Sequence, residues 1–472
     1  MSDLQKKEQP WYSGISRYQW LVLLIASLGW VFDIFEGQIF VASMRDAMPN
    51  LLGLGPDDPK VIRWNEWAFG SFLLGGAFGG VLFGKISDQI GRSKTLIITI
   101  LFYSLFTCIT AFSQAPWHMV VLRFFVAMGV GGEWAVASAM VAEVMPKRSR
   151  AVMSSIFHAS SVFGTLLAAV AGAYVVGNEA LGMNAWRWGF AIGVLPALLT
   201  LWIRWKLREP ERWQKAQEKA KTDESAKPGR LIELLQGPNL RNTVVGVTLA
   251  SVGLVTFWGG HIYGKNALMR NAEATILADA GVEVSVLSDP DATDEAKAAV
   301  KEEKTAVLTK TENKTKMKRA EMLSMTLNTL GGGLGLVLFG TISNRLGRRG
   351  AFVLYHAAGF VTMLMLFLWL MPSGASALVL GLFLPIFGFF TLGMHAGYAV
   401  YFPELYPTRL RGSGAGFCFN MGRLAMAAAF VLFGFFLTVP PEQKAIMLSP
   451  LYLVGVIVVF FARETRDEDL PE

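Results

Sequence analysis

Apolar stretches long enough to cross a lipid bilayer fill most of this chain. A transmembrane helix needs roughly 20 mostly apolar residues. The stretches reach that length and do not alternate between apolar and polar residues, which excludes a closed β-barrel. With 53% hydrophobic and 17% charged residues, the chain is also too apolar for an ordinary soluble enzyme. We therefore predict an all-α membrane protein with twelve transmembrane helices in a lipid bilayer. The spans are expected at residues 20–44, 66–84, 93–112, 117–142, 151–175, 187–207, 242–268, 321–342, 351–371, 374–399, 411–438 and 443–461.

Two polar motifs between these stretches occur once in each half of the chain. Gly84–Arg92 (GKISDQIGR) returns as Gly340–Arg348 (GTISNRLGR). Glu143–Arg150 (EVMPKRSR) returns as Glu404–Arg411 (ELYPTRLR). A duplicated set of spans predicts two pseudo-symmetric six-helix bundles that rock against each other around a central site. This architecture is typical of a transporter that works by alternating access.

Two longer polar segments interrupt the apolar pattern and define the expected domains. The first bundle is expected at residues 1–207, a cytoplasmic linker at 208–241, the second bundle at 242–463 and a cytoplasmic tail at 464–472. An external insert at 269–320 lies within the second bundle and has a helical composition. This insert is either a helical cap or lid, or an insertion without a function.

Clusters of lysine and arginine indicate the orientation of the chain, whose net charge is +7. With an even number of spans, these clusters fall on one side of the membrane together with both termini. The positive-inside rule makes that side cytoplasmic, in an inner or plasma membrane. The orientation in the membrane thus explains the excess of lysine and arginine over acidic residues, and we expect no nucleic-acid partner. The clusters are Lys85, Arg92 and Lys94; Lys147, Arg148 and Arg150; residues 204–230; Arg345, Arg348 and Arg349; and Arg409 and Arg411.

The sequence carries no motif for enzymatic chemistry. It has no Cys/His cluster with metal-ligand spacing, and the glycine run at 331–335 lacks the lysine of a phosphate-binding loop. Cys108 and Cys418 lie in apolar stretches of different halves, where we expect them to pack as small apolar residues. We therefore expect no enzyme activity, no metal and no cofactor, with a proton as the coupling ion and a gradient as the driving force.

The duplicated motifs carry charges that can link helices on the cytoplasmic side. Asp88 can face the positive end of a neighbouring helix. Arg92 can pair with Glu143, and Arg150 can supply a second cation to the same carboxylate. We predict a gating latch that holds the helices together while the cytoplasmic side is closed. The second half repeats the set as Arg348, Glu404 and Arg411, with Asn344 in place of the acid.

These motifs resemble those of the major facilitator superfamily, and the resemblance covers essentially the whole chain. Residues 123–133 (RFFVAMGVGGE), 208–212 (REPER) and 403–407 (PELYP) are similar to motifs of the branch that holds sugar porters and organic-acid/proton symporters. The resemblance implies the major facilitator fold, with a substrate site near the middle of the membrane.

Within that branch, the first span resembles aromatic-acid/proton symporters. Residues 33–36 (DIFE) are similar to their Asp-Gly-x-Asp signature, with Ile34 in place of glycine and Glu36 in place of the second aspartate. The paired glutamines that sugar porters carry in the seventh span are missing from residues 244–263. The resemblance therefore favours a small organic anion, such as a lactate- or sialate-like monocarboxylate or an aromatic acid, over a sugar.

Four charged residues within the spans are costly to bury and are therefore candidates for function. Asp33 and Glu36 lie three residues apart on one face of the first span. The resemblance places Arg123 of the fourth span opposite that face. A carboxyl group beside an arginine can exchange between ion-paired and protonated forms, as proton coupling requires. Glu133, further along the fourth span, is either a second proton carrier or a buried acid bonded to a neighbouring helix.

Arg423 is the cation that points most directly to the substrate. It lies about a dozen residues into the eleventh span, or roughly 18 Å along the helix, close to the middle of the membrane. A guanidinium there can bind a carboxylate through two hydrogen bonds. The alternative is a structural pair with Asp33 or Glu36. Asn420, on the same helix face, could donate to the same ligand.

Two histidines and a tryptophan complete the predicted substrate site. His158 in the fifth span and His395 in the tenth can relay a proton or contact an anion, because histidine titrates near neutrality. Each can equally be a hydrogen-bonded packing residue. Trp258, in the outer half of the seventh span, can form an outer gate or belong to an interfacial aromatic belt.

The sequence therefore predicts a secondary active transporter that moves a small organic anion together with protons by alternating access, as a monomer. A symporter or uniporter for sugars or polyols is the first alternative, and an exporter of metabolites or drugs is the second. A membrane sensor that uses the external insert as a receptor is a third. The central charges argue against a sensor, which needs no ionised groups at the membrane midplane.

Overall fold

The computed structural model describes residues 10–55, 58–176, 182, 184–289, 291–436 and 439–472. Helices are the only regular elements in these ranges, and nine of the described helices are long and apolar enough to cross a membrane. Three further crossings complete the twelve that were predicted. The segment Thr311–Leu370 contains two crossings because the chain reverses at Gly347. A shorter apolar segment begins at Ala185, and another helix covers Arg411–Phe436.

The first eight helices form the N-terminal bundle. They are α1 (Arg17–Leu52), α2 (Pro59–Ile90), α3 (Arg92–Thr110), α4 (Pro116–Val144), α5 (Lys147–Ala159), α6 (Ser161–Ala171), α7 (Ala185–Ala191) and α8 (Pro196–Lys206). α1 begins after Ser16, which forms a capping box with Gln19, and ends at Gly53 in the left-handed conformation with φ of 65°. α2 and α4 begin with Pro59 and Pro116, because proline lacks the N–H that the first turn leaves unpaired. α1 and α2 extend well beyond the predicted spans 20–44 and 66–84.

Helices from α10 onward form the C-terminal bundle and its external insert. The bundle contains α10 (Gly237–Gly259), α11 (Asn266–Asp279), α13 (Thr311–Leu364), α14 (Ala377–Gly393), α15 (Ala396–Tyr401), α16 (Arg411–Phe436), α17 (Pro441–Leu448) and α18 (Pro450–Phe460). The insert adds α12 (Asp294–Leu308), and the linker between the bundles holds α9 (Glu211–Thr222). The predicted span 411–438 ends on residues 437–438, which lie outside the described residues.

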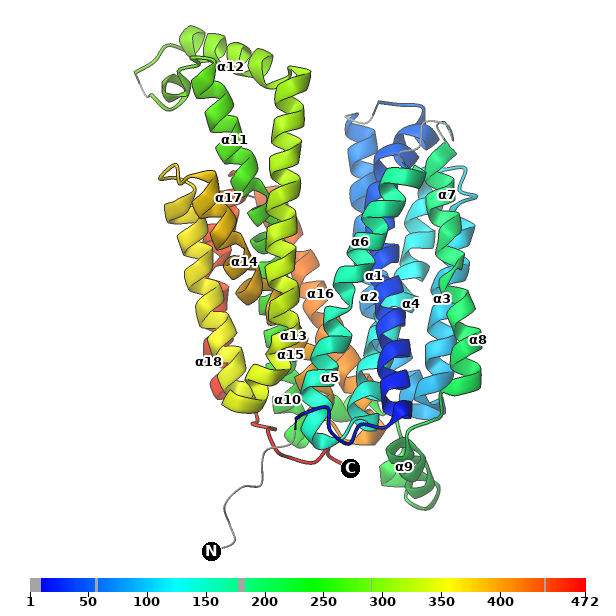
Figure 1. Cartoon of the computed structure of the whole chain (residues 1–472). Coiled ribbons are helices and arrows are strands. Elements are labelled where there is room, and N and C mark those ends of the chain that lie inside the picture. Colours follow the sequence, from blue (N-terminus) through cyan, green and yellow to red (C-terminus); the bar gives the residue numbers. More distant parts are fainter. Residues whose placement is uncertain (1–9, 56–57, 177–181, 183, 290, 437–438) are drawn as a thin grey trace, which may run out of the picture.

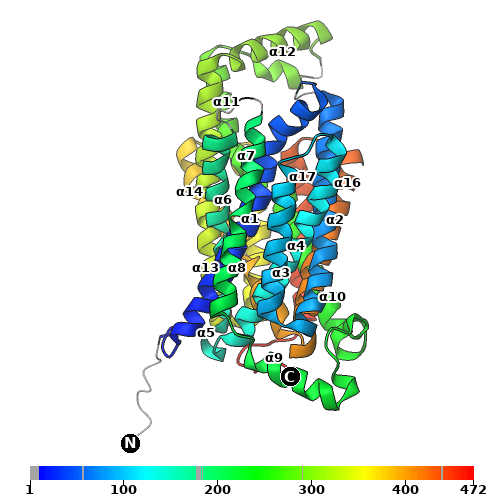
Figure 2. The ribbon, with the colours of Figure 1, turned by 90° about the vertical axis from the view of Figure 1, so that its right-hand side faces the viewer.

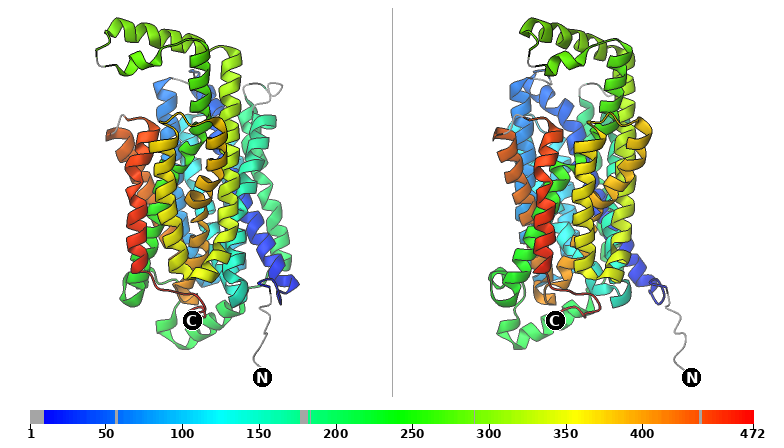
Figure 3. Two further views of the ribbon diagram at one scale, coloured as in Figure 1. Left: turned by 60° about the vertical axis from the view of Figure 1, so that its left-hand side comes forward. Right: turned by 90° about the vertical axis from the view of Figure 1, so that its left-hand side faces the viewer.

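The two bundles stand side by side with their helices roughly parallel (Figure 1). α9 and the C-terminus lie at one end of the molecule, which we call the terminal side, and α12 lies at the other end, the distal side (Figure 2). α18 and the half of α13 after Gly347 lie on the outer face of the C-terminal bundle, away from the N-terminal bundle (Figure 3), whereas the half of α13 before Gly347 faces α5.

The chain reverses direction at equivalent glycines in the two bundles. Gly91, between α2 and α3, has φ of 115°, and Gly347, within α13, has φ of 80°. Residues other than glycine rarely adopt these angles. A Cβ atom at Gly91 would overlap the carboxylate of Glu209, and one at Gly347 would overlap that of Glu464. The duplicated motif thus builds the same turn twice, each closed by a carboxylate.

The bundles meet where α2 packs against α16 and α5 packs against α13. Small residues allow these helices to approach closely, because a Cβ atom at Gly84 would overlap the backbone of Gly412. A Cβ atom at Gly340 would likewise overlap the backbone of Ala151. Both contacts lie toward the terminal side, where the interface is consequently tight.

The insert at residues 269–320 is a helical arm with a small apolar cluster of its own. α11 continues the seventh crossing outward, α12 lies across the top, and the start of α13 returns (Figure 1). Lys304 Nζ lies 2.7 Å from Glu273 Oε1, which ties α12 to α11. The helical composition of this segment correctly indicated helices. The cluster contains Ile276, Leu277, Val282 and Val307.

The predicted tail, residues 464–472, packs against the terminal side and contacts both bundles. Leu470 is 3% exposed, and the carbonyl oxygen of Pro471 accepts a hydrogen bond from Arg411 Nη2 at 2.9 Å. Asp469 Oδ1 lies 3.7 Å from Lys147 Nζ at the start of α5. The tail is therefore part of the folded surface.

Candidate functional site

Glu36 and Arg123 form an ion pair inside the N-terminal bundle. Glu36 Oε1 accepts hydrogen bonds from Arg123 Nη1 at 2.7 Å and from Thr107 Oγ1 at 2.9 Å. Arg123 Nη2 donates to Thr110 Oγ1 at 3.1 Å, and both charged side chains are fully buried. Arg123 is thus an internal cation whose charge Glu36 already balances. Its guanidinium lies 5.0 and 4.9 Å from the ring centres of Phe40 and Phe190.

Asp33, about one turn before Glu36 on α1, faces different groups. Its carboxyl group lies close enough to that of Glu133 on α4, and to the guanidinium of Arg423 on α16, to interact with both electrostatically. Asp33 and Glu133 are each 1% exposed, and among the described residues no hydrogen bond is formed to their carboxyl oxygens. A Cβ atom at Gly29 would overlap Glu133 Oε1, so this glycine makes room for the acid. We call Asp33 and Glu133 the acid pair.

Arg423 is partly exposed, and no described carboxylate forms an ion pair with it. Its Nη1 donates to Asn420 Oδ1 at 3.2 Å, and its guanidinium lies 5.0 Å from the ring centre of Phe419. Phe419 in turn stacks on Trp134 of α4, with ring centres 4.0 Å apart. A neutral amide and one aromatic face hold the guanidinium, which leaves further N–H donors for a carboxylate.

Asn420 positions Arg423 and is itself closed off from solvent. Its side chain is fully buried, and its Nδ2 donates to Gly416 O at 2.9 Å. A Cβ atom at Gly80 would overlap the amide, so α2 packs directly against it. The sequence suggested Asn420 as a ligand contact, whereas the structure gives both ends of its amide a protein partner.

The two predicted histidines are held by neighbouring groups. His158 Nδ1 accepts a hydrogen bond from Trp134 Nε1 at 3.2 Å. His395 Nδ1 lies 3.1 Å from Leu392 O and donates to it. The first contact requires an unprotonated Nδ1, and therefore a neutral imidazole, at His158, whereas the second contact fixes Nδ1 of His395 as a donor. His158 lies within electrostatic reach of Arg423, so it flanks the site without carrying a charge.

Trp258 joins the two bundles in their distal halves. Its indole is half-buried on α10 and meets the ring of Phe69 on α2, with ring centres 6.1 Å apart and an angle of 64° between the planes. This edge-to-face contact has no hydrogen bond to hold it. It can therefore break when the bundles separate.

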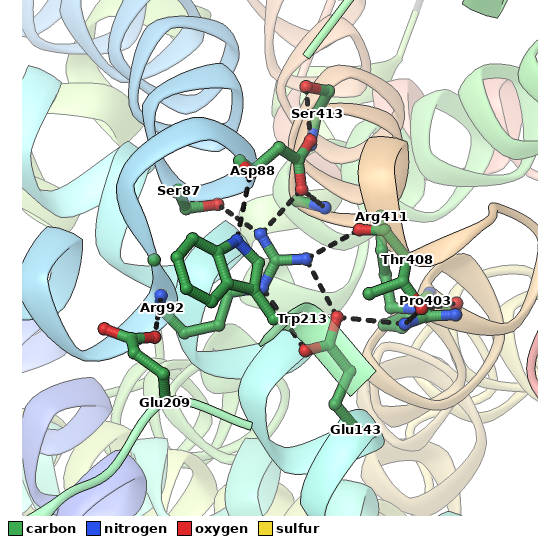
Figure 4. A network of polar contacts seen from close by, with 12 residues as sticks. Ser87, Asp88, Arg92, Glu143, Glu209, Trp213, Pro403, Thr408, Arg411 and Ser413 are labelled. Carbon is green, nitrogen blue, oxygen red and sulfur yellow. Dashed lines mark hydrogen bonds and ion pairs between the residues drawn. The ribbon is translucent and has the colours of Figure 1, made fainter. Parts of the chain in front are cut away.

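A buried polar network joins the bundles on the terminal side (Figure 4). Asp88 Oδ1 accepts hydrogen bonds from Arg92 Nη1 at 2.7 Å and from Gly412 N at 3.0 Å. Asp88 Oδ2 accepts from Ser413 N at 2.8 Å. These two amides belong to the first turn of α16, whose partial positive charge the carboxylate neutralises. The predicted contact of Asp88 with a helix end is present, and that helix belongs to the opposite bundle.

Glu143 forms the second link in this network (Figure 4). Its Oε1 accepts hydrogen bonds from Arg92 Nη2 at 2.8 Å and from Arg411 Nη1 at 2.9 Å. The predicted pair with Arg92 is present, but the prediction that Arg150 supplies the second cation is wrong. Arg150 Nε donates instead to Ala142 O at 3.1 Å. The equivalent arginine of the other repeat, Arg411, replaces it because the start of α16 packs against the end of α4.

The second copy of the network lies mainly within the C-terminal bundle. Arg348 Nε and Nη2 donate to the two oxygens of Glu404, each at 2.9 Å. Thr465 Oγ1 donates to Glu404 Oε2 at 2.6 Å. The neutral Asn344 accepts from Arg348 Nη1 at 3.1 Å and reaches the N-terminal bundle only through Arg148 O at 3.5 Å.

Within the described residues, the hydrogen bonds between the two bundles all come from these terminal-side motifs. The distal contact, by comparison, is aromatic. The structure is thus closed on the terminal side.

In the part of the chain that is described, no three His, Cys, Asp or Glu residues are grouped to hold a metal ion. Cys108 is half-buried, Cys418 is buried, and neither is in a disulfide.

Sequence reasoning missed two acids that cap helix ends. Glu209 Oε2 accepts from Arg92 N at 2.6 Å, at the start of α3. Glu464 Oε1 accepts from Arg348 N at 2.8 Å, just after the reversal in α13. A signal was present, because both acids directly follow an arginine at the end of the sixth or the twelfth span.

Comparisons with known proteins agree with this architecture. Residues 45–231 match a family model described as sugar (and other) transporter. The sialic acid transporter NanX of Escherichia coli is 26% identical over 422 residues, which cover 89% of this chain and 88% of that protein. The cis,cis-muconate transport protein of Acinetobacter baylyi is 27% identical over 406 residues, covering 84% and 85%. The proton:xylose symporter XylE has a TM-score of 0.66 at 16% identity, covering 96% of this chain and 98% of that chain. The predicted fold is confirmed.

Proposed function

We propose that this chain, which is a multi-pass transporter of the major facilitator superfamily and not an enzyme, moves a small organic anion together with protons. The names of two relatives, a sialic acid transporter and a muconate transport protein, support a carboxylate as the substrate. Transport by alternating access follows from two bundles that meet around a central site. The substrate is a monocarboxylate or an aromatic acid.

Arg423 is the observation that carries this proposal. A guanidinium in a membrane bundle is costly unless it serves a function or has a partner. Arg423 is partly exposed and has no ion pair with a described residue. A carboxylate substrate supplies the missing partner and can accept two parallel hydrogen bonds. Phe419 beneath the guanidinium offers apolar surface for the rest of the molecule.

Proton coupling falls to the acids beside this cation. Asp33, Glu36 and Glu133 are buried carboxyl groups close to Arg123 and Arg423. Such groups change protonation when access to water or to a counter-charge changes. The terminal-side network around Asp88 and Glu143 then acts as the gate that opens when the bundles rock.

We also propose an orientation for the molecule. The terminal side carries the basic motifs of both repeats, so it faces the cytoplasm of an inner or plasma membrane. The distal arm around α12 is then external. The two bundles provide a complete site within one chain, so the working unit is a monomer.

Uptake by reconstituted vesicles tests the proposal. Purified protein in liposomes receives labelled lactate, benzoate or xylose under an imposed pH gradient. We expect acid uptake that rises with the gradient and little uptake of xylose. Arg423→Gln should weaken carboxylate binding on the order of 100-fold, because a charged hydrogen-bonding partner is lost, and Arg423→Lys less so. Arg63→Gln, at an exposed arginine near the distal end of α2, is the matched loss of charge and should bind as the wild type does.

A symporter or uniporter for sugars or polyols is the second candidate. The family description and the likeness to a xylose symporter favour it. The same vesicles separate the two candidates. Xylose uptake that exceeds acid uptake, and that survives Arg423→Gln, would replace the anion with a neutral solute.

A further inference from the structure

The acid pair of Asp33 and Glu133 lies in a setting that favours a bound proton. All four of its carboxyl oxygens are buried, and none accepts a hydrogen bond from a described residue. Two ionised carboxylates in contact repel each other strongly where water is excluded. A proton held between them removes this repulsion and makes one group a donor to the other. Two neighbouring acids, each 1% exposed and without a hydrogen-bond partner among the described residues, therefore point to a proton as their ligand.

Few other ionisable groups face the pair, and each comes from a different element. Arg423 on α16 is the cation that faces it. Tyr103 on α3 directs a buried hydroxyl group without a hydrogen-bond partner toward it. Glu36 lies further along α1 and is balanced by Arg123, at 2.7 Å. Of the two histidines that flank the site, His158 is neutral because its Nδ1 accepts a hydrogen bond, and His395 Nδ1 donates to the carbonyl of Leu392.

Charge balance then links the pair to the substrate. With Arg423 charged and one proton on the pair, the region holds one positive and one negative charge. A carboxylate that binds Arg423 adds a second negative charge, which is costly in a poorly hydrated chamber. A second proton on the pair restores neutrality.

We propose that the acid pair takes up one proton with each monocarboxylate bound at Arg423, so that the loaded and empty carriers are both neutral and transport moves no net charge. The proton comes from the solution on the open side and leaves with the substrate on the other side. This assignment rests on the proposed function and deepens it by naming the proton site and the stoichiometry. A dicarboxylate would need one further proton for the same balance.

Proton uptake on binding tests the assignment in the wild-type protein. Purified transporter in weak buffer with a pH indicator is titrated with benzoate. We expect one proton to be taken up per benzoate bound, and the Kd to rise about tenfold per pH unit above the pH at which the pair loses its second proton. In vesicles at equal pH, a potassium diffusion potential should leave benzoate uptake unchanged. Binding without proton uptake, or uptake that follows the potential, overturns the proposal.

The variant Asp33→Asn/Glu133→Gln locates the proton. Both replacements keep the shape of the side chains and remove the titratable groups. We expect the variant to bind benzoate at Arg423 with a Kd that no longer changes with pH, and its uptake to respond to the membrane potential. Proton uptake of one per benzoate in this variant would place the proton elsewhere and overturn the assignment.

The proposed function and the proton assignment fail in different ways. If the wild-type protein binds no carboxylate at all, the proposed function is wrong and the assignment falls with it. If the wild-type protein binds and transports benzoate without an accompanying proton, only the assignment to the acid pair is wrong.

Discussion

Gly29 sets the position of the acid pair, because the carboxylate of Glu133 lies against its Cα atom. Gly29→Ala would force Glu133 Oε1 to move. We expect the free energy of unfolding to fall by about 1–3 kcal/mol. pH-driven uptake should fall at least about tenfold, because a misplacement of about 1 Å can cost a functional group much of its effect. Labelled benzoate uptake and a thermal melt of the same preparation separate the two effects.

Gly37→Ala is the matched control on the same helix. A Cβ atom at Gly37 would make only an ordinary 3.7 Å contact with Phe72. Its uptake should therefore stay within about twofold of the wild type. Equal losses in both variants would show that α1 tolerates no added methyl group, and would count against a special role for Gly29.

Single residues could be selected from the sequence, but their partners could not. Charged residues inside apolar spans are visible because burial makes them costly, and this criterion selected Asp33, Glu36 and Arg123. Which acid pairs with Arg123 depends on how α1 is rotated relative to α4. The spacing of three residues between Asp33 and Glu36 does not reveal this rotation. The partner of Glu143 was also not predictable, because two copies of one motif each supply an arginine. Arg411 takes the place that was predicted for Arg150.

The first turn of α16 is held by a carboxylate, whereas the corresponding position in the other repeat is an amide. Asp88→Asn keeps the shape but removes the charge that faces Gly412 N and Ser413 N. We expect a loss of about 1–3 kcal/mol for the closed terminal side, because hydrogen bonds to a charged group are the stronger kind. Hydrogen exchange of residues 411–416 should then speed up on the order of tenfold or more.

Asn344→Asp is the reciprocal change. It places a charge beside Arg348 and near the start of α5, but it removes the Nδ2 donor to Arg148 O, so exchange at residues 147–152 should change by less than about threefold. Faster hydrogen exchange of residues 411–416 in both variants would mean that the charge of Asp88 is not what holds the first turn of α16.

The C-terminal tail should stabilise the closed terminal side as a whole element. Removal of residues 469–472 exposes the site of Leu470 and takes away the carbonyl of Pro471 that Arg411 contacts. We expect a loss of about 2–3 kcal/mol, measured as a lower Tm of the detergent-solubilised protein. Asp469→Asn removes only the exposed pair with Lys147 and should shift the free energy of unfolding by less than about 1 kcal/mol. A truncated chain with an unchanged Tm would show that the tail rests on the surface without stabilising it.

At the scale of elements, apolar length was a reliable guide and helix ends were not. α1 runs to Leu52, beyond the predicted end at residue 44. Its last turns lie outside the apolar stretch, where amino-acid composition no longer distinguishes a helix from a loop. The reversal at Gly347 was predictable from the repeat, since Gly91 occupies the same place in the first copy. The packed tail was not predictable, because one buried leucine in a charged segment gives no periodic signal.

At the scale of the whole molecule, the polar contacts between the described parts of the bundles lie at one end only. The terminal side is joined by buried ion pairs and helix caps, such as that of Asp88. The distal side is joined by aromatic surface at Phe69 and Trp258. Breaking buried ion pairs is costly unless new partners or water replace them, so this asymmetry favours the state described here. A transport cycle must reverse it.

A crosslink between the bundles on the distal side should therefore stop transport. In a background with Cys108 and Cys418 replaced by serine, Phe69→Cys/Trp258→Cys places two thiols where the rings now lie 6.1 Å apart. Oxidation or a short bifunctional reagent holds α2 against α10, and we expect benzoate uptake to fall more than about tenfold and to return on reduction. The pair Phe367→Cys/Phe387→Cys has the same 6.1 Å separation within the C-terminal bundle and should keep its uptake when crosslinked. Equal rates before and after the crosslink between the bundles would mean that they need not part on the distal side. The opening would then have to come from bending within a bundle, because the cycle would proceed with the distal ends held together.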